Sequence, residues 1–187
     1  WHESNGGVLE SLGLWMRPRY YRANGADAFT AGIAEAKRVR DIGGIIDSAT
    51  LGKIEIAGPD AAAFLDTLYL TKASTIKVGR SKYMVNLRED GMVLDDGIVL
   101  RLATNRFLAT VSSGHAEHML SHFEYYCVEG HDAAIAGTPT ISRMRAVSVT
   151  DVTESWSVIA VAGATSRNAL RQVLGDAWHT HLATLSH

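Results

Sequence analysis

The chain has 187 residues, of which 47% are hydrophobic and 20% are charged, and its formal net charge at pH 7 is −2. This composition is ordinary for a globular protein of one large or two small domains, and it lacks the basic excess that nucleic-acid-binding proteins carry. No apolar run approaches the roughly 18 residues that span a bilayer, so we expect neither a nucleic acid nor a membrane among its partners. The single cysteine, Cys127, cannot form an internal disulfide, which favours a reducing compartment and predicts a cytoplasmic location.

Residues 1–26 are predicted to form an extended N-terminal arm, because Pro18 and the Asn-Gly pair at 24–25 interrupt any regular element. A helix is predicted over 27–40, ended by the two glycines at 43–44. Its apolar residues recur at helical spacing and predict one buried face. They are Phe29, Ile33, Ala36 and Val39.

Short segments with alternating or β-branched residues predict strands. They are residues 53–56, 83–87, 92–94, 98–102 and 107–111. A helix is predicted to start at Pro59-Asp60 and a second one to cover 114–128, followed by a linker of small residues around 133–138. Asp90-Gly91 predicts a hairpin turn. Because the sequence begins at Trp1 and breaks off within an unfinished segment at 180–187, we expect a piece of a longer polypeptide, truncated at both ends.

A possible internal repeat links two parts of the chain. Residues 158–163 resemble residues 53–58, and each segment precedes a predicted helix whose apolar positions match. The matching pairs are Leu65 with Leu170 and Leu68 with Val173. We therefore predict an α+β fold with duplicated β–α units, in which helices pack on one face of antiparallel sheets and both helices bury their apolar faces.

Two adjacent carboxylates, Asp95 and Asp96, lie between two apolar runs. A strand that enters a core seldom carries such a pair, because burying a polar group without a partner costs roughly 2–7 kcal/mol. On the pattern alone, a polar β-turn is the simpler interpretation. Alternatively, strand alternation sends one carboxylate to solvent and the other inward, where it can accept N–H groups or act as a base.

Other polar clusters carry weaker signals. His115, His118 and His122 share one predicted helix face, but no further ligand completes the set, so we interpret a solvated face and predict no metal site. The serines at 112–113 are interpreted as a helix cap rather than as nucleophiles. Arg40, Thr50 and Lys53 surround the turn from the first helix into the first strand, and they form either an anion site or a surface cluster of ion pairs.

Four motifs together resemble a known family. In chain order they are residues 47–55, 58–61, 79–83 and 91–97, and they match the order found in the folate-binding aminomethyltransferase (glycine cleavage T-protein) family. The Thr-Leu-Gly-Lys form at 50–53 and the Arg-Pro-x-Tyr arm at 17–20 are similar in particular to the C-terminal region of the sarcosine oxidase alpha subunit of heterotetrameric enzymes. The resemblance spans roughly residues 10–175 and implies a partial aminomethyltransferase-type fold, with residues 27–187 as the N-terminal part of the domain.

The resemblance also implies a function. Asp96 corresponds to the family's catalytic carboxylate beside the folate amines, and Tyr83 to a folate-binding tyrosine. In sarcosine oxidases a flavin, FMN or FAD, on the beta subunit converts an N-methyl amino acid to an imine, which tetrahydrofolate captures as 5,10-methylenetetrahydrofolate. Arg40, Thr50 and Lys53 would then bind a flavin phosphate shared with that partner.

The family's second folate half-site, an Arg-x-x-Tyr-Thr-Gly-Glu type motif, is not found within the 187 residues. We therefore expect one wall of a pocket and a fragment that is inactive alone. Two alternatives stay open: an aminomethyltransferase or demethylase that works without flavin, and a non-catalytic folate-binding or interaction module.

Overall fold

The computed structural model describes residues 1–23, 25–129 and 146–175. The linker predicted at 133–138 and the segment at 180–187 lie outside the described residues. The chain divides into two units, which we describe separately. The sheet unit contains residues 12–15 and 49–157, and the ribbon unit contains residues 1–11, 16–48 and those from 158 onward.

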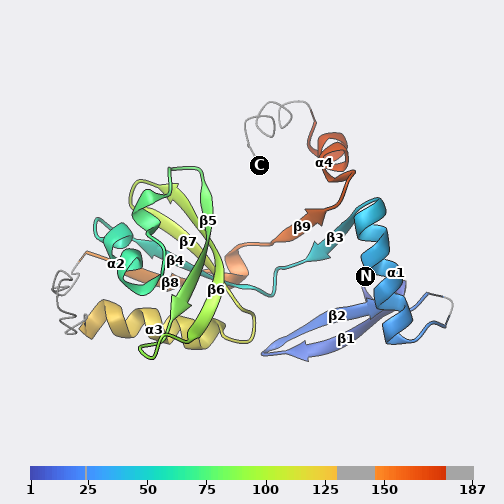
Figure 1. Ribbon diagram of the computed structural model, residues 1–187, viewed down its shortest axis with the longest axis horizontal. Helices are drawn as coiled ribbons and strands as arrows, with labels where there is room; N and C mark the ends of the chain where they lie inside the picture. The colour runs from blue at the N-terminus through green and yellow to red at the C-terminus, as the bar shows by residue number, and fades with distance from the viewer. Residues whose placement is uncertain (24, 130–145, 176–187) are drawn as a thin grey trace. The chain divides into compact units, whose positions relative to one another are not determined.

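The sheet unit is built on a five-stranded sheet with the order β5-β6-β7-β4-β8 (Figure 1). All neighbouring strands in this sheet are antiparallel. The strands are β4 (Gly52–Ala57), β5 (Ser81–Leu87), β6 (Val93–Ala103), β7 (Arg106–Val111) and β8 (Ser148–Asp151). The unit also contains the 3-10 helices η2 (Ala73–Thr75) and η3 (Thr153–Ser155).

Two helices, α2 (Ala61–Leu68) and α3 (Ala116–Glu129), pack on one face of this sheet, as predicted. Alternation along β4 sends Ile54 and Ile56 to that face, where both are buried. The predicted apolar face of α2 is buried too. The rings of Phe64 and Phe123 meet edge to face at 6.3 Å. Burying one such side chain contributes about 1.5–3 kcal/mol, so these contacts hold the helices to the sheet.

Strand β6 corrects the interpretation of the two carboxylates as a turn. It runs without interruption from Val93 to Ala103 and includes both aspartates, where we had predicted two separate strands. The turn lies earlier, at the predicted Asp90-Gly91 pair, where Gly91 adopts a φ of 81°. A strand can carry adjacent carboxylates here because one is exposed and the other has a hydrogen-bond donor.

The ribbon unit begins with the 3-10 helix η1 (Glu3–Asn5). It also holds most of two paired strands, β1 (Gly7–Leu12) and β2 (Trp15–Tyr21), whose connecting tip at 12–15 belongs to the sheet unit. The prediction that Pro18 interrupts any regular element was therefore wrong. Pro18 lies inside β2. A strand in a two-stranded sheet has one free edge, so a residue without an N–H is tolerated there.

The rest of the ribbon unit consists of α1 (Ala28–Asp41), β3 (Gly44–Asp47), β9 (Ile159–Ala162) and α4 (Ser166–Leu174). Strands β3 and β9 pair antiparallel. Helix α1 starts after Asp27, which accepts a 2.8 Å hydrogen bond from the backbone N–H of Thr30. The predicted burial of apolar faces is wrong for both helices: Phe29 is 77% exposed and Val173 is 81% exposed. Among the described residues of this unit, no second layer covers these faces.

The two β–α units share a local structure but differ in their surroundings. Both β4–α2 and β9–α4 connect strand to helix through a glycine with positive φ, Gly58 and Gly163. Strand β4 lies between two others in the large sheet, whereas among the described residues β9 pairs only with β3. The repeated pattern therefore specifies the turn and not the packing. In the described part of the chain, no helix is long and apolar enough to cross a membrane.

Candidate functional site

The two adjacent aspartates point to opposite faces of the sheet. Asp95 lies on the face that α2 and α3 cover and is only 4% exposed. Asp96 lies on the outer face, which we define as the face opposite these helices, and is exposed. Alternation along a strand requires this arrangement. The prediction that the pair divides between the two faces is thus confirmed.

Buried Asp95 is held by its neighbours. Its Oδ2 atom accepts a 2.9 Å hydrogen bond from the backbone N–H of Ser112, and its Oδ1 atom lies 3.8 Å from Nδ1 of His115. Burial, and to a lesser degree the charge of Asp95, raises the pKa of the Tyr69 hydroxyl. These contacts give Asp95 a structural environment within the core.

Exposed Asp96 has a different partner. The hydroxyl of Tyr83, on the neighbouring strand β5, donates a 2.6 Å hydrogen bond to its Oδ2 atom. This bond, together with slight desolvation, raises the pKa of the Tyr83 phenol. The phenol therefore stays protonated and keeps donating, which orients the carboxylate. An oriented, accessible carboxylate can accept N–H groups of a ligand or take up a proton.

Thr110 on β7 is a polar residue of this face that sequence reasoning missed. The backbone N–H of Ile98 donates to its hydroxyl at 2.8 Å, and the hydroxyl donates to the carbonyl of Ile98 at 3.1 Å. Its only sequence signal is a hydroxyl within the apolar run 107–111. This hydroxyl alone does not predict a bonding partner, because the partner, Ile98, is set by the pairing of β6 with β7.

The predicted anion-binding residues are distributed over both units. Lys53 is fully buried and donates from Nζ to the carbonyl of Ala49 at 2.7 Å. Thr50 is 9% exposed and accepts a 3.1 Å hydrogen bond from Ser113. Arg40 is exposed near the end of α1, in the ribbon unit. The structure thus brings Thr50 and Lys53 together in one unit, while the three-residue anion site stays a prediction.

The start of α3 differs from the predicted serine cap. The helix begins at Ala116, and the hydroxyl of Ser113 bonds to Thr50 rather than to the helix. His115 and His118 are exposed, as predicted, whereas His122 is half-buried with its ring 4.8 Å from that of Tyr126. Within the described ranges, no group of three His, Cys, Asp or Glu residues gathers in a geometry suited to a metal ion.

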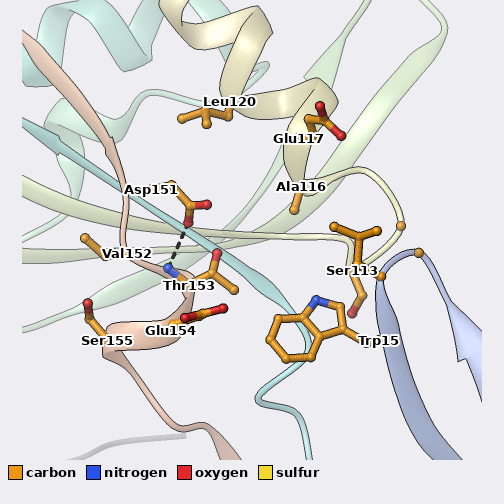
Figure 2. A pocket seen from close by; sticks show the side chains of 13 residues that line it. Trp15, Ser113, Ala116, Glu117, Leu120, Asp151, Val152, Thr153, Glu154 and Ser155 are labelled. Carbon is orange, nitrogen blue, oxygen red and sulfur yellow. Dashed lines mark hydrogen bonds between the residues drawn. The ribbon is translucent and has the colours of Figure 1, made fainter.

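A cavity of about 790 Å³ lies at the start of α3 (Figure 2). Its walls are the turn at 13–15, the residues around the start of α3, and residues 151–155. Three acidic side chains line it, and none of its described lining residues is basic. They are Glu117, Asp151 and Glu154. Like charges repel, so this cavity disfavours an anionic ligand. Neither Asp96 nor Tyr83 belongs to its walls.

Comparisons with known proteins give consistent matches. The model of the GCVT N-terminal domain family matches residues 1–185. The chain is 38% identical over 173 residues to sarcosine oxidase subunit alpha from Corynebacterium sp. (strain U-96), covering 92% of the chain and 17% of that protein. It is 29% identical over 173 residues to an aminomethyltransferase from Corynebacterium jeikeium (strain K411), covering 92% of the chain and 39% of that protein.

Among solved structures, the glycine cleavage system aminomethyltransferase T from Bartonella henselae matches with a TM-score of 0.73 and 23% identity. The match covers 94% of this chain and 42% of that one. It shows the fold, which is that of part of an aminomethyltransferase. The chain thus spans less than half the length of each of these relatives.

Proposed function

Since this chain belongs to the GCVT N-terminal domain family, we propose that the outer face of its five-stranded sheet forms one wall of a tetrahydrofolate site. Asp96 is the catalytic residue of this proposal, and Tyr83 is a folate-binding residue beside it. The observation that carries the proposal is the hydrogen bond from Tyr83 to Asp96 on an exposed sheet face. Family membership also confirms the resemblance that the four sequence motifs predicted.

The residues of this face suit such a ligand. A reduced pterin offers N–H donors on a flat ring, which need a carboxylate acceptor and an apolar or aromatic surface. Asp96 supplies the acceptor, and Tyr83, which is 57% exposed, supplies an aromatic ring. Ile98, 38% exposed, adds apolar surface on the same face. The acidic cavity near α3 suits the negatively charged glutamate tail of folate less well.

Asp96 would orient an amine N–H of the ligand and accept its proton. Tyr83 donates to Oδ2 of this carboxylate, so Oδ1 would be the atom that contacts the ligand. When bound, tetrahydrofolate would supply the amine nitrogens that take up a one-carbon unit. A positioned acid–base group of this kind contributes about 10²–10⁴-fold to a rate.

For the full-length protein we propose a place in a sarcosine-oxidase-type complex. The 38% identity to a sarcosine oxidase subunit alpha supports this choice. A flavin, FMN or FAD, on a beta subunit would oxidise an N-methyl amino acid to an imine. Tetrahydrofolate bound beside Asp96 would then capture the one-carbon unit of this imine as 5,10-methylenetetrahydrofolate. Binding of the flavin phosphate by Arg40, Thr50 and Lys53 stays a prediction, as does the cytoplasmic location.

The second candidate is an aminomethyltransferase that works without flavin. The matches to an aminomethyltransferase sequence and to an aminomethyltransferase fold favour it. Both candidates use the same sheet face and the same carboxylate. They differ in whether a flavin-bearing partner must be present, so a transfer assay with and without such a partner separates them.

The test uses the full-length protein with its partner subunits. Asp96→Asn should slow one-carbon transfer to tetrahydrofolate by about 10²–10⁴-fold, because the amide cannot take up the proton. Asp151→Asn is the matched control, since it changes a carboxylate of the acidic cavity. Unchanged transfer in Asp96→Asn would remove the catalytic role. Failure of the full-length protein to bind tetrahydrofolate in calorimetric titration would leave a non-catalytic interaction module.

A further inference from the structure

The strand that carries Asp96 is paired over different lengths with its two neighbours. On the side of β5, β6 is paired along 93–100, including Asp96 opposite Val85. On the side of β7, the register ends at the pair Val99 and Ala109, although β7 continues to Val111. Asp96 therefore lies in a stretch of β6 that is paired with β5 but has no paired residue on β7.

Two side chains link β6 and β7 in this stretch in place of the backbone ladder. Upstream of Asp96, the carboxylate of Asp95 accepts the backbone N–H of Ser112 at 2.9 Å. Downstream, the hydroxyl of Thr110 bonds both the N–H and the carbonyl of Ile98, at 2.8 and 3.1 Å. The two bridges bracket Asp96 and Gly97. The Asp95 link is one direct hydrogen bond and the Thr110 link is two, so together they limit the distance between β6 and β7.

The residue between the bridges allows this close arrangement. A Cβ atom on Gly97 would lie 1.9 Å from the backbone carbonyl oxygen of Thr110 and 3.2 Å from its hydroxyl oxygen. Only glycine permits β7 to approach so closely. The backbone carbonyl of Thr110 thus leaves no room for a side chain at position 97, while its hydroxyl is hydrogen-bonded to the backbone of Ile98.

We propose that Thr110 is a positioning residue for Asp96, and that its hydroxyl sets the place of the carboxylate by holding the stretch 96–98 of β6. The inference rests on the function proposed above. Thr110 acts through the backbone, since its hydroxyl bonds Ile98 and not Asp96. Without the hydroxyl, the N–H and the carbonyl of Ile98 lose their partner on β7. Residues 96–98 of β6 can then move away from β7.

Small movements matter for a reacting group, because a misplacement of about 1 Å can cost about 10²-fold in rate. The hydrogen bond between Tyr83 and Asp96 is a sensitive reporter of such a movement. It joins residues on two strands, and its length of 2.6 Å leaves little tolerance for a shift of β6.

The experiment compares Thr110→Val, which keeps the shape and removes the hydroxyl, with Thr110→Ser, which keeps the hydroxyl. Thr150→Val is the matched control, because Thr150 lies on β8, outside the contact between β6 and β7. In the full-length protein, the amide of Ile98 should exchange hydrogen faster in Thr110→Val alone. The pKa of Tyr83 should also fall toward its ordinary value in Thr110→Val, and not in the other two variants.

In the transfer assay, Thr110→Val should lower kcat by roughly 10- to 100-fold with little change in KM, and Thr110→Ser should restore it. If Thr110→Val does not fold, Thr110→Ala against Thr110→Ser decides in the same way. Wild-type transfer rates, together with a Tyr83 pKa that stays as high as in the wild type, in the variants without the hydroxyl would overturn the inference. If Asp96→Asn itself leaves transfer unchanged, the proposed function fails, while the exchange and pKa readouts still decide whether Thr110 positions Asp96.

Discussion

Tyr83 and Asp96 are hydrogen-bonded across two strands although they are not opposite each other. In the register of β5 and β6, Tyr83 pairs with Ile98 and Asp96 pairs with Val85. The 2.6 Å bond therefore follows the diagonal, which an aromatic side chain is long enough to cross. A diagonal bond depends on the register of both strands, so it couples the orientation of the carboxylate to the alignment of the sheet.

Removal of the phenol hydroxyl tests this coupling. Tyr83→Phe should weaken tetrahydrofolate binding to the full-length protein by about 2- to 12-fold, the equivalent of one hydrogen bond worth about 0.5–1.5 kcal/mol. Tyr125→Phe is the control, because Tyr125 is similarly exposed on α3. Equal affinities of Tyr83→Phe and wild type, measured by calorimetric titration, would show that the hydroxyl does not prepare the site.

The ionisation of Tyr83 should depend on Asp96. The hydrogen bond to Asp96 raises the pKa of this phenol above its ordinary value of 10.0. A raised pKa in the folded state means that the stabilisation is fully present below about pH 10 and is lost as the pH rises through the higher folded value. In Asp96→Asn the phenol should ionise at lower pH. Tyrosinate absorbance, with Tyr83→Phe subtracted, measures the shift; an unchanged titration curve would contradict the bond.

Gly97 should tolerate no side chain. In Gly97→Ala the new Cβ would lie 1.9 Å from a carbonyl oxygen of β7, so the strands must separate. We expect a lower melting temperature and weaker folate binding. Gly114→Ala adds the same methyl group where no atom lies within 4 Å, and it should change neither quantity. Similar melting curves for the two variants would show that the contact is relaxed in solution.

The two β–α units should respond differently to matched truncations. Leu68 and Val173 occupy equivalent helix positions, yet Leu68 is 7% exposed and Val173 is 81% exposed. Leu68→Ala should cost about 2–5 kcal/mol of unfolding free energy, and Val173→Ala no more than about 0.5 kcal/mol. Urea unfolding measures both. A comparable loss in Val173→Ala would mean that α4 is packed in solution.

Local patterns predicted the elements better than their surroundings. The periodicity over 27–40 led to the correct helix α1, and Asp90-Gly91 led to the correct turn. The same periodicity wrongly predicted that Phe29 is buried. Whether a helix face is covered depends on elements far away in the sequence, and these leave no trace in the helix itself.

The candidate site was predictable only in part. Strand alternation correctly predicted that the two acids face opposite sides of the sheet, but it did not say which of them faces inward. The structure places Asp95 in the core and leaves Asp96, to which the resemblance gave the catalytic role, exposed on the outer face. The burial of Lys53 could not be foreseen, because a lysine in an alternating strand ordinarily faces water. Thr110 was missed since its two hydrogen bonds join residues 12 apart through a register that the sequence does not encode locally. The error at Pro18 came from treating proline as a breaker in every strand.

The positions of Asp95 and Asp96 along β6 decide which face of the sheet each side chain occupies. Asp95, four residues after the turn at Gly91, faces the core, and Asp96, five residues after it, faces outward. A single inserted residue between the turn and Asp95 would exchange them, because a shift of one flips every side chain to the other face. The N–H of Ser112 would lose its carboxylate, and a charge without that partner would enter the core. An inserted residue should thus be tolerated within the turn itself, whereas one inserted within β6 before Asp95 should disrupt both the core and the site, although all original amino acids are kept.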